Sequence, residues 1–129
     1  MAPQAQQAVS FLLAHGATGE RLFVGPHDLR HTFGSDIYLY HLLPQLTPAT
    51  YFLEMNPRSA TRPGSRLAGD VASADWLVLN RAWDECGAAV PGRVPGSDAP
   101  NEIVRTQFAP AAVFEPFYIY HRRRVAASR

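Results

Sequence analysis

Apolar side chains alternate along the chain between helical spacing and short unbroken runs. Residues 4–15 place alanine, valine and leucine on one face at helical spacing, and Gly16 ends that stretch. The same criteria predict further helices over 36–43, over 65–74 and from Asp98 or Asn101 to Phe108. Runs that are almost wholly apolar and stop at glycine, proline or asparagine are typical of buried strands. Three such runs occur, at 21–24, 50–54 and 75–80.

This order of elements predicts an α/β fold. Strands separated by helices imply parallel pairing through crossover connections. The runs 111–114 and 117–121 flank Glu115-Pro116 and predict a closing hairpin that adds one antiparallel strand at an edge. We therefore expect a three-layer αβα sandwich with a mostly parallel five-stranded sheet, in Rossmann-like or flavodoxin-like order. Glycines and prolines within 87–100 predict a long loop.

Composition limits the class of protein. The chain has 129 residues, 47% apolar and 18% charged, which predicts one folded domain over 1–129, with 1–4 as the start of a linker and 122–129 as a basic tail. A single cysteine, Cys86, excludes an internal disulfide framework and a multi-cysteine metal site. No apolar run approaches the roughly 18 residues of a membrane span.

Charge is concentrated at the C-terminal end. The last nine residues carry four arginines and no acid, which leaves eight arginines against eleven acids in the rest of the chain. Nucleic-acid binding requires basic residues across a folded face, so we expect no nucleic-acid partner. The segment 121–124 is either a solvated chain end or an arm that is attracted to anionic phosphate.

Polar residues gather at the predicted carboxyl ends of the strands, where open α/β sheets bind ligands. We call these residues the strand-end rim. Its members are His27, Asp28, Glu54, Asn56, Arg58, Asn80, Arg81, Trp83, Ser97 and Asp98. Ser97-Asp98 either joins the rim or only caps the following helix. Trp83 either stacks on a sugar ring or packs in the core.

Known catalytic and cofactor motifs are missing. The chain has no Gly-x-Gly-x-x-Gly after the first strand, no lysine for a Walker loop and no Gly-x-Ser-x-Gly. We expect no cofactor and no catalytic residue assignment. His27 and His31 are four residues apart, but the predicted loop around them argues against a metal site. Asp84-Glu85 beside Cys86 hints at acid–base or thiol chemistry, although Cys86 has no basic neighbour to activate it.

Several segments resemble one family over residues 5–122. The similar segments are VGPHDLRHT (24–32), YLYHLLP (38–44), TPATYFLEMNP (47–57), RPGS (62–65), DWLVL (75–79), Trp83 and GSDAPN (96–101). Together they resemble the soluble C-terminal domain of bacterial polytopic membrane glycosyltransferases, described as dolichyl-phosphate-mannose mannosyltransferase-like. The resemblance implies that catalysis resides in a membrane-embedded part of the parent chain. This domain would then be an accessory, extracytoplasmic partner of that part, covering the transfer site or binding glycan or lipid-linked sugar.

Two alternatives remain open. A small stand-alone enzyme on a sugar or phosphorylated substrate would act through Asp28, Glu54 and Asp98, and it requires carboxylates that converge in one pocket with at least one raised pKa. A protein–protein interaction module requires a contiguous apolar surface. The aromatic residues that could supply that surface are Tyr38, Tyr40, Phe117, Tyr118 and Tyr120.

Overall fold

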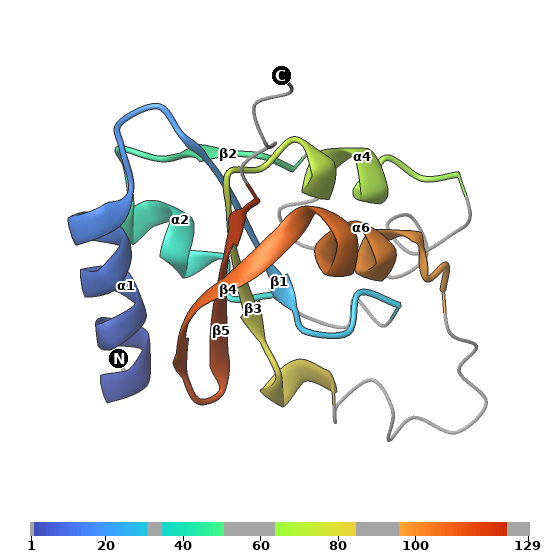
Figure 1. The fold of residues 1–129 in the computed structure, drawn as a ribbon. Coiled ribbons are helices and arrows are strands. Elements are labelled where there is room, and N and C mark those ends of the chain that lie inside the picture. The colour runs from blue at the N-terminus through green and yellow to red at the C-terminus, as the bar shows by residue number, and fades with distance from the viewer. Residues whose placement is uncertain (1, 31–34, 51–63, 85–95, 124–129) are drawn as a thin grey trace.

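A computed structural model describes residues 2–30, 35–50, 64–84 and 96–123. Within them the chain is α/β and forms one five-stranded mixed sheet with helices (Figure 1). The helices are α1 (Pro3–His15), α2 (Tyr38–Leu42), α4 (Leu67–Ala72) and α6 (Ala99–Gln107). The strands are β1 (Arg21–Pro26), β2 (Thr47–Pro48), β3 (Trp76–Asn80), β4 (Phe108–Phe114) and β5 (Phe117–Arg122).

The strand order is β2-β1-β3-β5-β4. β1 pairs in parallel with both β2 and β3, whereas β5 is antiparallel to β3 and to β4. The expectation of a mostly parallel sheet is therefore wrong, and the order is neither the Rossmann-like 3-2-1-4-5-6 nor the flavodoxin-like 2-1-3-4-5. The parallel pairing of the first three strands agrees with the crossover argument, and the difference arises in the closing hairpin.

The hairpin inserts its second strand into the sheet, not at its edge. β5 carries bulky side chains in alternation, with Phe117 and Ile119 buried and Tyr118 and Tyr120 half-buried. Such a strand is suited to an inner position, where both of its faces are covered. β4 is largely exposed and contains Pro110, which lacks a backbone donor and is tolerated at an edge. The expected single antiparallel edge strand is thus corrected to an antiparallel strand between β3 and β4.

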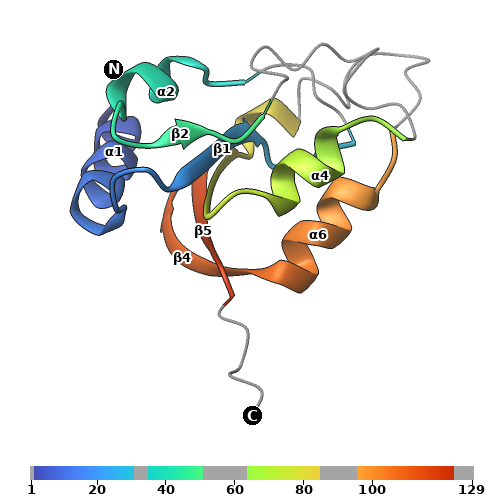
Figure 2. The same cartoon turned by 90° about the horizontal axis from the view of Figure 1, so that it is seen from above.

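Helices pack against both faces of the sheet (Figure 2). Side chains alternate along β1, so that Leu22 and Val24 face α1 and α2 while Phe23 faces α4 and α6. β3 does the same, with Trp76 and Val78 on one face and Leu77 on the other. The strands are buried on both sides, which explains their continuous apolar sequence.

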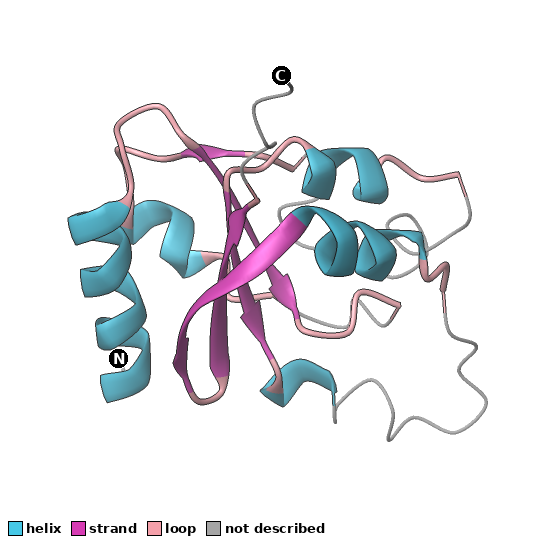
Figure 3. Cartoon of the chain, viewed as in Figure 1, coloured by secondary structure: helices cyan, strands magenta, loops and turns pink. Residues whose placement is uncertain are grey.

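The helices and most strands match the expected segments (Figure 3). One strand does not: β2 is the short pair Thr47–Pro48, where we expected a strand over 50–54. Thr50 lies outside the strand, and 51–54 lie outside the described residues. The long loop expected over 87–100 is described only from residue 96, and α6 already begins at Ala99.

The expected basic tail starts later than residue 122. Arg122 belongs to β5, and its guanidinium donates hydrogen bonds to the carbonyl oxygens of Ala72 and Ala74 at the end of α4. Its Nε donates to the Ala74 carbonyl at 3.0 Å. This arginine therefore links the hairpin to the α4 side of the sheet, and the next residue, Arg123, donates its backbone N–H to the Gln107 carbonyl at 2.8 Å.

Candidate ligand-binding site

The carboxyl ends of β1 and β3 lie side by side. Pro26 is in register with Asn80, and the His27 N–H donates to the Asn80 carbonyl at 3.1 Å. A Cβ at Gly25 would lie 2.9 Å from the Phe23 ring, so glycine permits the close packing of the strand just before this point. The two segments that leave these strands consequently start from neighbouring positions.

A chain of polar contacts joins these two segments to β5. The Asp84 carboxylate accepts the Asp28 N–H at 2.7 Å through Oδ1. Its Oδ2 lies 3.5 Å from His27 Nδ1. The opposite ring nitrogen, His27 Nε2, lies 3.3 Å from the Tyr120 hydroxyl. The imidazole is therefore held between a carboxylate on one side and a phenol on the other.

Asn101 connects the segment after β1 to α6. Its side-chain carbonyl accepts the Leu29 N–H at 2.9 Å. Its amide donates to Asp28 Oδ1 and to Asp98 Oδ1, each at 3.0 Å. Asn101 lies within the first turns of α6; two of its contacts hold the loop after β1, and the third reaches Asp98 at the start of the same helix.

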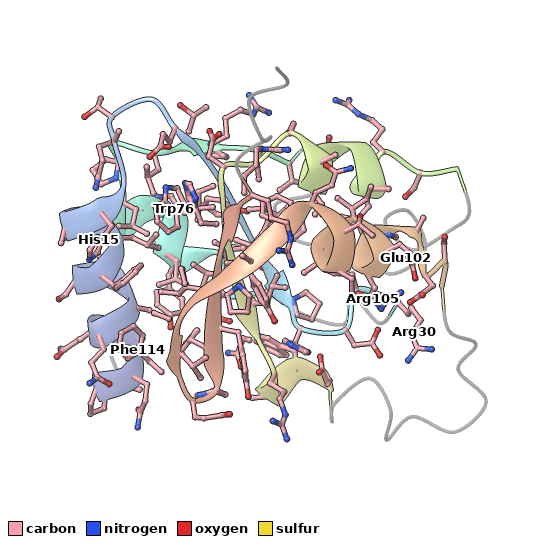
Figure 4. All side chains as sticks on the ribbon, viewed as in Figure 1. His15, Arg30, Trp76, Glu102, Arg105 and Phe114 are labelled. Atoms are coloured by element: carbon pink, nitrogen blue, oxygen red, sulfur yellow. The ribbon has the colours of Figure 1, made fainter. Side chains whose placement is uncertain are left out.

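Figure 4 labels the two arginines of this region, Arg30 and Arg105. Each of them is paired with a carboxylate. Arg30 contacts both oxygens of Asp28, through Nε at 3.0 Å and Nη2 at 2.8 Å. These hydrogen bonds hold the pKa of the Asp28 carboxyl well below its usual range, although burial acts in the opposite direction. Arg105 donates to Asp98 at 2.8 Å and also to Glu102. Its hydrogen bond lowers the pKa of Asp98.

These side chains surround a cavity of about 570 Å³ at the carboxyl ends of β1 and β3. Three carboxylates, two guanidiniums, an imidazole, an amide and a phenol line it, together with Leu79 and Val104. Burial raises the pKa of Asp84, whereas the other two carboxylates have lowered pKa values. The cavity combines an apolar surface with hydrogen-bonding groups, as small-molecule sites do.

A second polar cluster lies on the α2 side of the same strand ends. Asp36 Oδ2 accepts hydrogen bonds from Asn80 Nδ2 at 2.8 Å and from the Trp83 indole N–H at 3.0 Å. The side-chain oxygen of Asn80, Oδ1, in turn accepts the Ala82 N–H at 2.8 Å. Asp36 and Asn80 are buried. The members of this closed cluster bind one another, and they hold the end of β3 against the segment that leads into α2.

The structure divides the expected strand-end rim. His27, Asp28 and Asp98 line the cavity, whereas Asn80 and Trp83 belong to the closed cluster. Arg81 is exposed and contacts Tyr118 and Glu115. Ser97 accepts the Ala99 N–H at 3.1 Å, as expected of a residue at a helix start. The remaining members Glu54, Asn56 and Arg58, and also His31, lie outside the described residues.

Several residues that line the cavity are not members of the predicted strand-end rim: Arg30, Asp84, Asn101, Arg105 and Tyr120. Asp84 carried a signal, because it follows a predicted strand end and was noted as a possible acid or base. Asn101 and Arg105 carried none, since they come from a helix whose position over the strand ends depends on the fold. For Tyr120 the sequence predicts only a possible apolar surface, because its place beside the cavity depends on the inner position of β5.

Comparisons with known proteins assign neither a family nor a function to this chain. No family model matches the sequence, and neither the curated proteins nor the solved structures yielded a significant similarity. None of the helices over the described ranges is long and apolar enough to cross a membrane. The described residues also contain no group of three or more histidine, cysteine or acidic side chains arranged to hold a metal ion. The site therefore has to be interpreted from its own geometry.

Proposed function

We propose that this chain is an accessory domain of a membrane glycosyltransferase and that it binds the sugar part of a glycan or a lipid-linked sugar in the cavity. The observation that carries the binding proposal is the convergence of polar side chains from four segments on one cavity of about 570 Å³. Carboxylates, an amide and the Tyr120 hydroxyl suit the many hydroxyl groups of a sugar, and Leu79 and Val104 suit its C–H surface.

Charge on the cavity lining favours a neutral sugar over a phosphate. Arg30 is engaged by Asp28 through two nitrogens, and Arg105 is engaged by Asp98 and Glu102. An anion would have to displace one of these carboxylates to gain a guanidinium. Asp84 adds a further acidic group to the lining. We therefore assign the cavity to the uncharged sugar ring and not to the phosphate of a lipid-linked donor.

The binding proposal is tested with a panel of neutral mono- and oligosaccharides and the matching sugar 1-phosphates, by calorimetry and by thermal shift. We expect at least one neutral glycan to bind and to lose roughly tenfold in affinity in Asp84→Asn and in Tyr120→Phe. Arg81→Ala is the matched control, because Arg81 is exposed and is not part of the cavity lining. Binding that is confined to phosphorylated sugars, or that is equal in all variants, would contradict the proposal.

Support for the membrane association comes from the resemblance described above. We expect the parent reading frame to encode hydrophobic segments of spanning length before residue 5, and a reporter fused to this domain to be exposed on the extracytoplasmic side. A parent frame without such segments would remove the glycosyltransferase context. The binding experiment above would remain valid in that case, because it uses only this chain.

The enzyme alternative is favoured by one observation. A stand-alone enzyme requires carboxylates in one pocket, at least one of them with a raised pKa. The cavity contains Asp28, Asp98 and Asp84, and burial raises the pKa of Asp84. The interaction-module alternative has less support. Phe117 is buried and Tyr40 is half-buried against the α1 side of the sheet, whereas Tyr120 packs on the α4 and α6 side. Phe117, Tyr40 and Tyr120 therefore do not share one surface.

A further inference from the structure

Sugar binding does not account for the order of the groups around His27. Tyr120 Oη lies 3.3 Å from Nε2 of this histidine, and Asp84 Oδ2 lies 3.5 Å from its Nδ1. A hydroxyl, an imidazole and a carboxylate in this order form the arrangement of nucleophile, base and positioning group found in acyl-transfer enzymes. Such contacts are often longer than ideal hydrogen bonds when no substrate is bound.

The surroundings of His27 favour one tautomer of its ring. A carboxylate beside Nδ1 favours the tautomer with hydrogen on that nitrogen, which leaves the Nε2 lone pair facing the tyrosine hydroxyl. Asp84 is held in place by the Asp28 N–H at 2.7 Å. His27 also contacts the Tyr118 ring, with the ring centroids 5.0 Å apart. The imidazole is thus oriented from several sides with its basic nitrogen toward Tyr120.

Tyr120 is exposed to the cavity but does not ionise easily. It lines the cavity and is half-buried. Burial raises its pKa, so the phenol stays protonated at neutral pH and can act as a nucleophile only when a base removes its proton during the attack. His27 Nε2 is positioned to be that base.

We propose that Tyr120 is a nucleophile that accepts an acyl group, with His27 as its general base and Asp84 as a positioning residue. The substrate class is an ester of a sugar hydroxyl, and in this respect the proposal rests on the proposed sugar binding. Tyr120 Oη forms a bond to the acyl carbon while its proton moves to His27 Nε2. The bond from the acyl carbon to the sugar oxygen breaks, and that oxygen takes the proton from His27. Water then hydrolyses the acyl-tyrosine to a carboxylic acid and restores the phenol.

Covalent trapping tests the nucleophile directly. In the full chain, phenylmethanesulfonyl fluoride should sulfonylate Tyr120, with fluoride as leaving group, at least tenfold faster than Tyr38, which is exposed on α2 and serves as the internal control. Peptide mass spectrometry measures both rates. His27→Gln keeps a hydrogen-bonding side chain but cannot take the proton, so it should slow the labelling of Tyr120 roughly tenfold or more without changing that of Tyr38. Equal rates at the two tyrosines, or no effect of His27→Gln, would overturn the proposal.

Chemical rescue separates a base from a merely structural residue. In His27→Ala, added imidazole should restore a substantial part of the Tyr120 labelling rate and leave Tyr38 unchanged. Asp84→Asn should lower the Tyr120 rate and shift the ¹⁵N signals of the His27 ring away from the Nδ1–H tautomer. If circular dichroism shows that His27→Ala is unfolded, the labelling rate of His27→Gln decides whether His27 acts as the base. Labelling that does not depend on imidazole in a folded His27→Ala protein would contradict the role of general base.

Turnover is measured with 4-nitrophenyl acetate as an acyl donor. We expect acetyl-Tyr120 in acid-quenched samples, or 4-nitrophenolate release that is lost in Tyr120→Phe, and either result supports acyl transfer. The absence of both acetylated Tyr120 and Tyr120-dependent 4-nitrophenolate release would overturn it. These assays contain no sugar, so the proposed sugar binding can fail in the calorimetric experiment while the nucleophile is confirmed here, and the reverse also holds.

Discussion

Two carboxylates at the ends of the same two strands have opposite surroundings. Asp36 is buried on the α2 side and accepts hydrogen bonds from Asn80 and from the Trp83 indole. Asp84 lies on the α6 side, retains a side-chain exposed fraction of 25% and faces a cavity. Its neighbour His27 is also partly exposed, at 35%. One acid is enclosed by the protein, and the other is open to a ligand.

The difference shows how one strand end can serve both stability and binding. Buried polar groups that satisfy one another fix the local structure, and removing a partner is costly. Groups that keep unused hydrogen-bonding capacity beside a cavity are available for a ligand. We therefore expect substitutions of Asp36, Asn80 or Trp83, the Asp36 cluster, to lower stability. Substitutions of Asp84, His27 or Tyr120, which we call the Asp84 chain of contacts, should alter binding and reactivity. The following predictions test this division.

The largest effect is expected for Asp36→Ala. This change leaves the amide of Asn80 and the indole N–H of Trp83 without their acceptor, so it should lower the free energy of unfolding by about 3 kcal/mol. Urea denaturation measures the change. Labelling of Tyr120 in the folded fraction should be unaffected. A loss below about 1 kcal/mol would show that the closed cluster does not stabilise the fold.

A smaller loss is expected for Trp83→Phe. Phenylalanine preserves most of the ring packing and removes only the N–H that donates to Asp36 at 3.0 Å. The free energy of unfolding should fall by about 1 kcal/mol, and the hydrogen bond from Asn80 should persist. The same urea experiment detects this change. Loss of glycan binding in this variant, at unchanged stability, would show that Trp83 contributes to ligand binding and not to stability.

Acid should affect Asp28 and Asp84 in opposite directions. Hydrogen bonds from Arg30 lower the pKa of Asp28 below that of the unfolded chain, so its contribution to stability is present above about pH 4 and is lost as the pH falls. Burial raises the pKa of Asp84, so its contribution is present below about pH 4 and is lost as the pH rises through the folded-state pKa.

Urea unfolding at a series of pH values distinguishes the two carboxyl groups. Arg30→Gln should reduce the loss of stability on acidification, because Asp28 then has a more ordinary pKa. Asp84→Asn should gain stability relative to the natural chain as the pH rises above about 4. Parallel pH curves for Asp84→Asn and the natural chain would contradict the raised pKa of Asp84.

The smallest stability effect is expected for Tyr120→Phe. Its hydroxyl contacts His27 at 3.3 Å beside the cavity, so the free energy of unfolding should change by no more than about 0.5 kcal/mol. Sugar affinity and labelling at position 120 should nevertheless fall. A thermal melt checks stability, with Arg81→Ala as a variant that should alter neither property. A large destabilisation by Tyr120→Phe would show that the contacts of Asp84, His27 and Tyr120 stabilise the fold, as those of Asp36 do.

Local patterns predicted the elements well but not all of the sheet. The helical spacing in 4–15 and the apolar run 75–80 correspond to α1 and β3 within a residue or two. The position of β5 did not follow from its hairpin sequence, because a hairpin can attach to a sheet through either of its strands. That choice depends on which strand has bulky side chains for both faces, and on Arg122 contacts with a distant helix end.

The sequence by itself determined that polar residues follow β1 and β3, since each strand end is marked by a change from apolar to polar side chains. This change predicts the site residues His27 and Asp28, and the start of the last predicted helix adds Asp98. Tertiary structure alone decided that Asn80 and Trp83 turn to Asp36 on one face of the sheet, while Asp84 meets His27 and Tyr120 on the other. The physical reason is that their partners, Asp36, His27 and Tyr120, come from segments that are distant in the chain, and only the folded sheet brings those segments to its two faces.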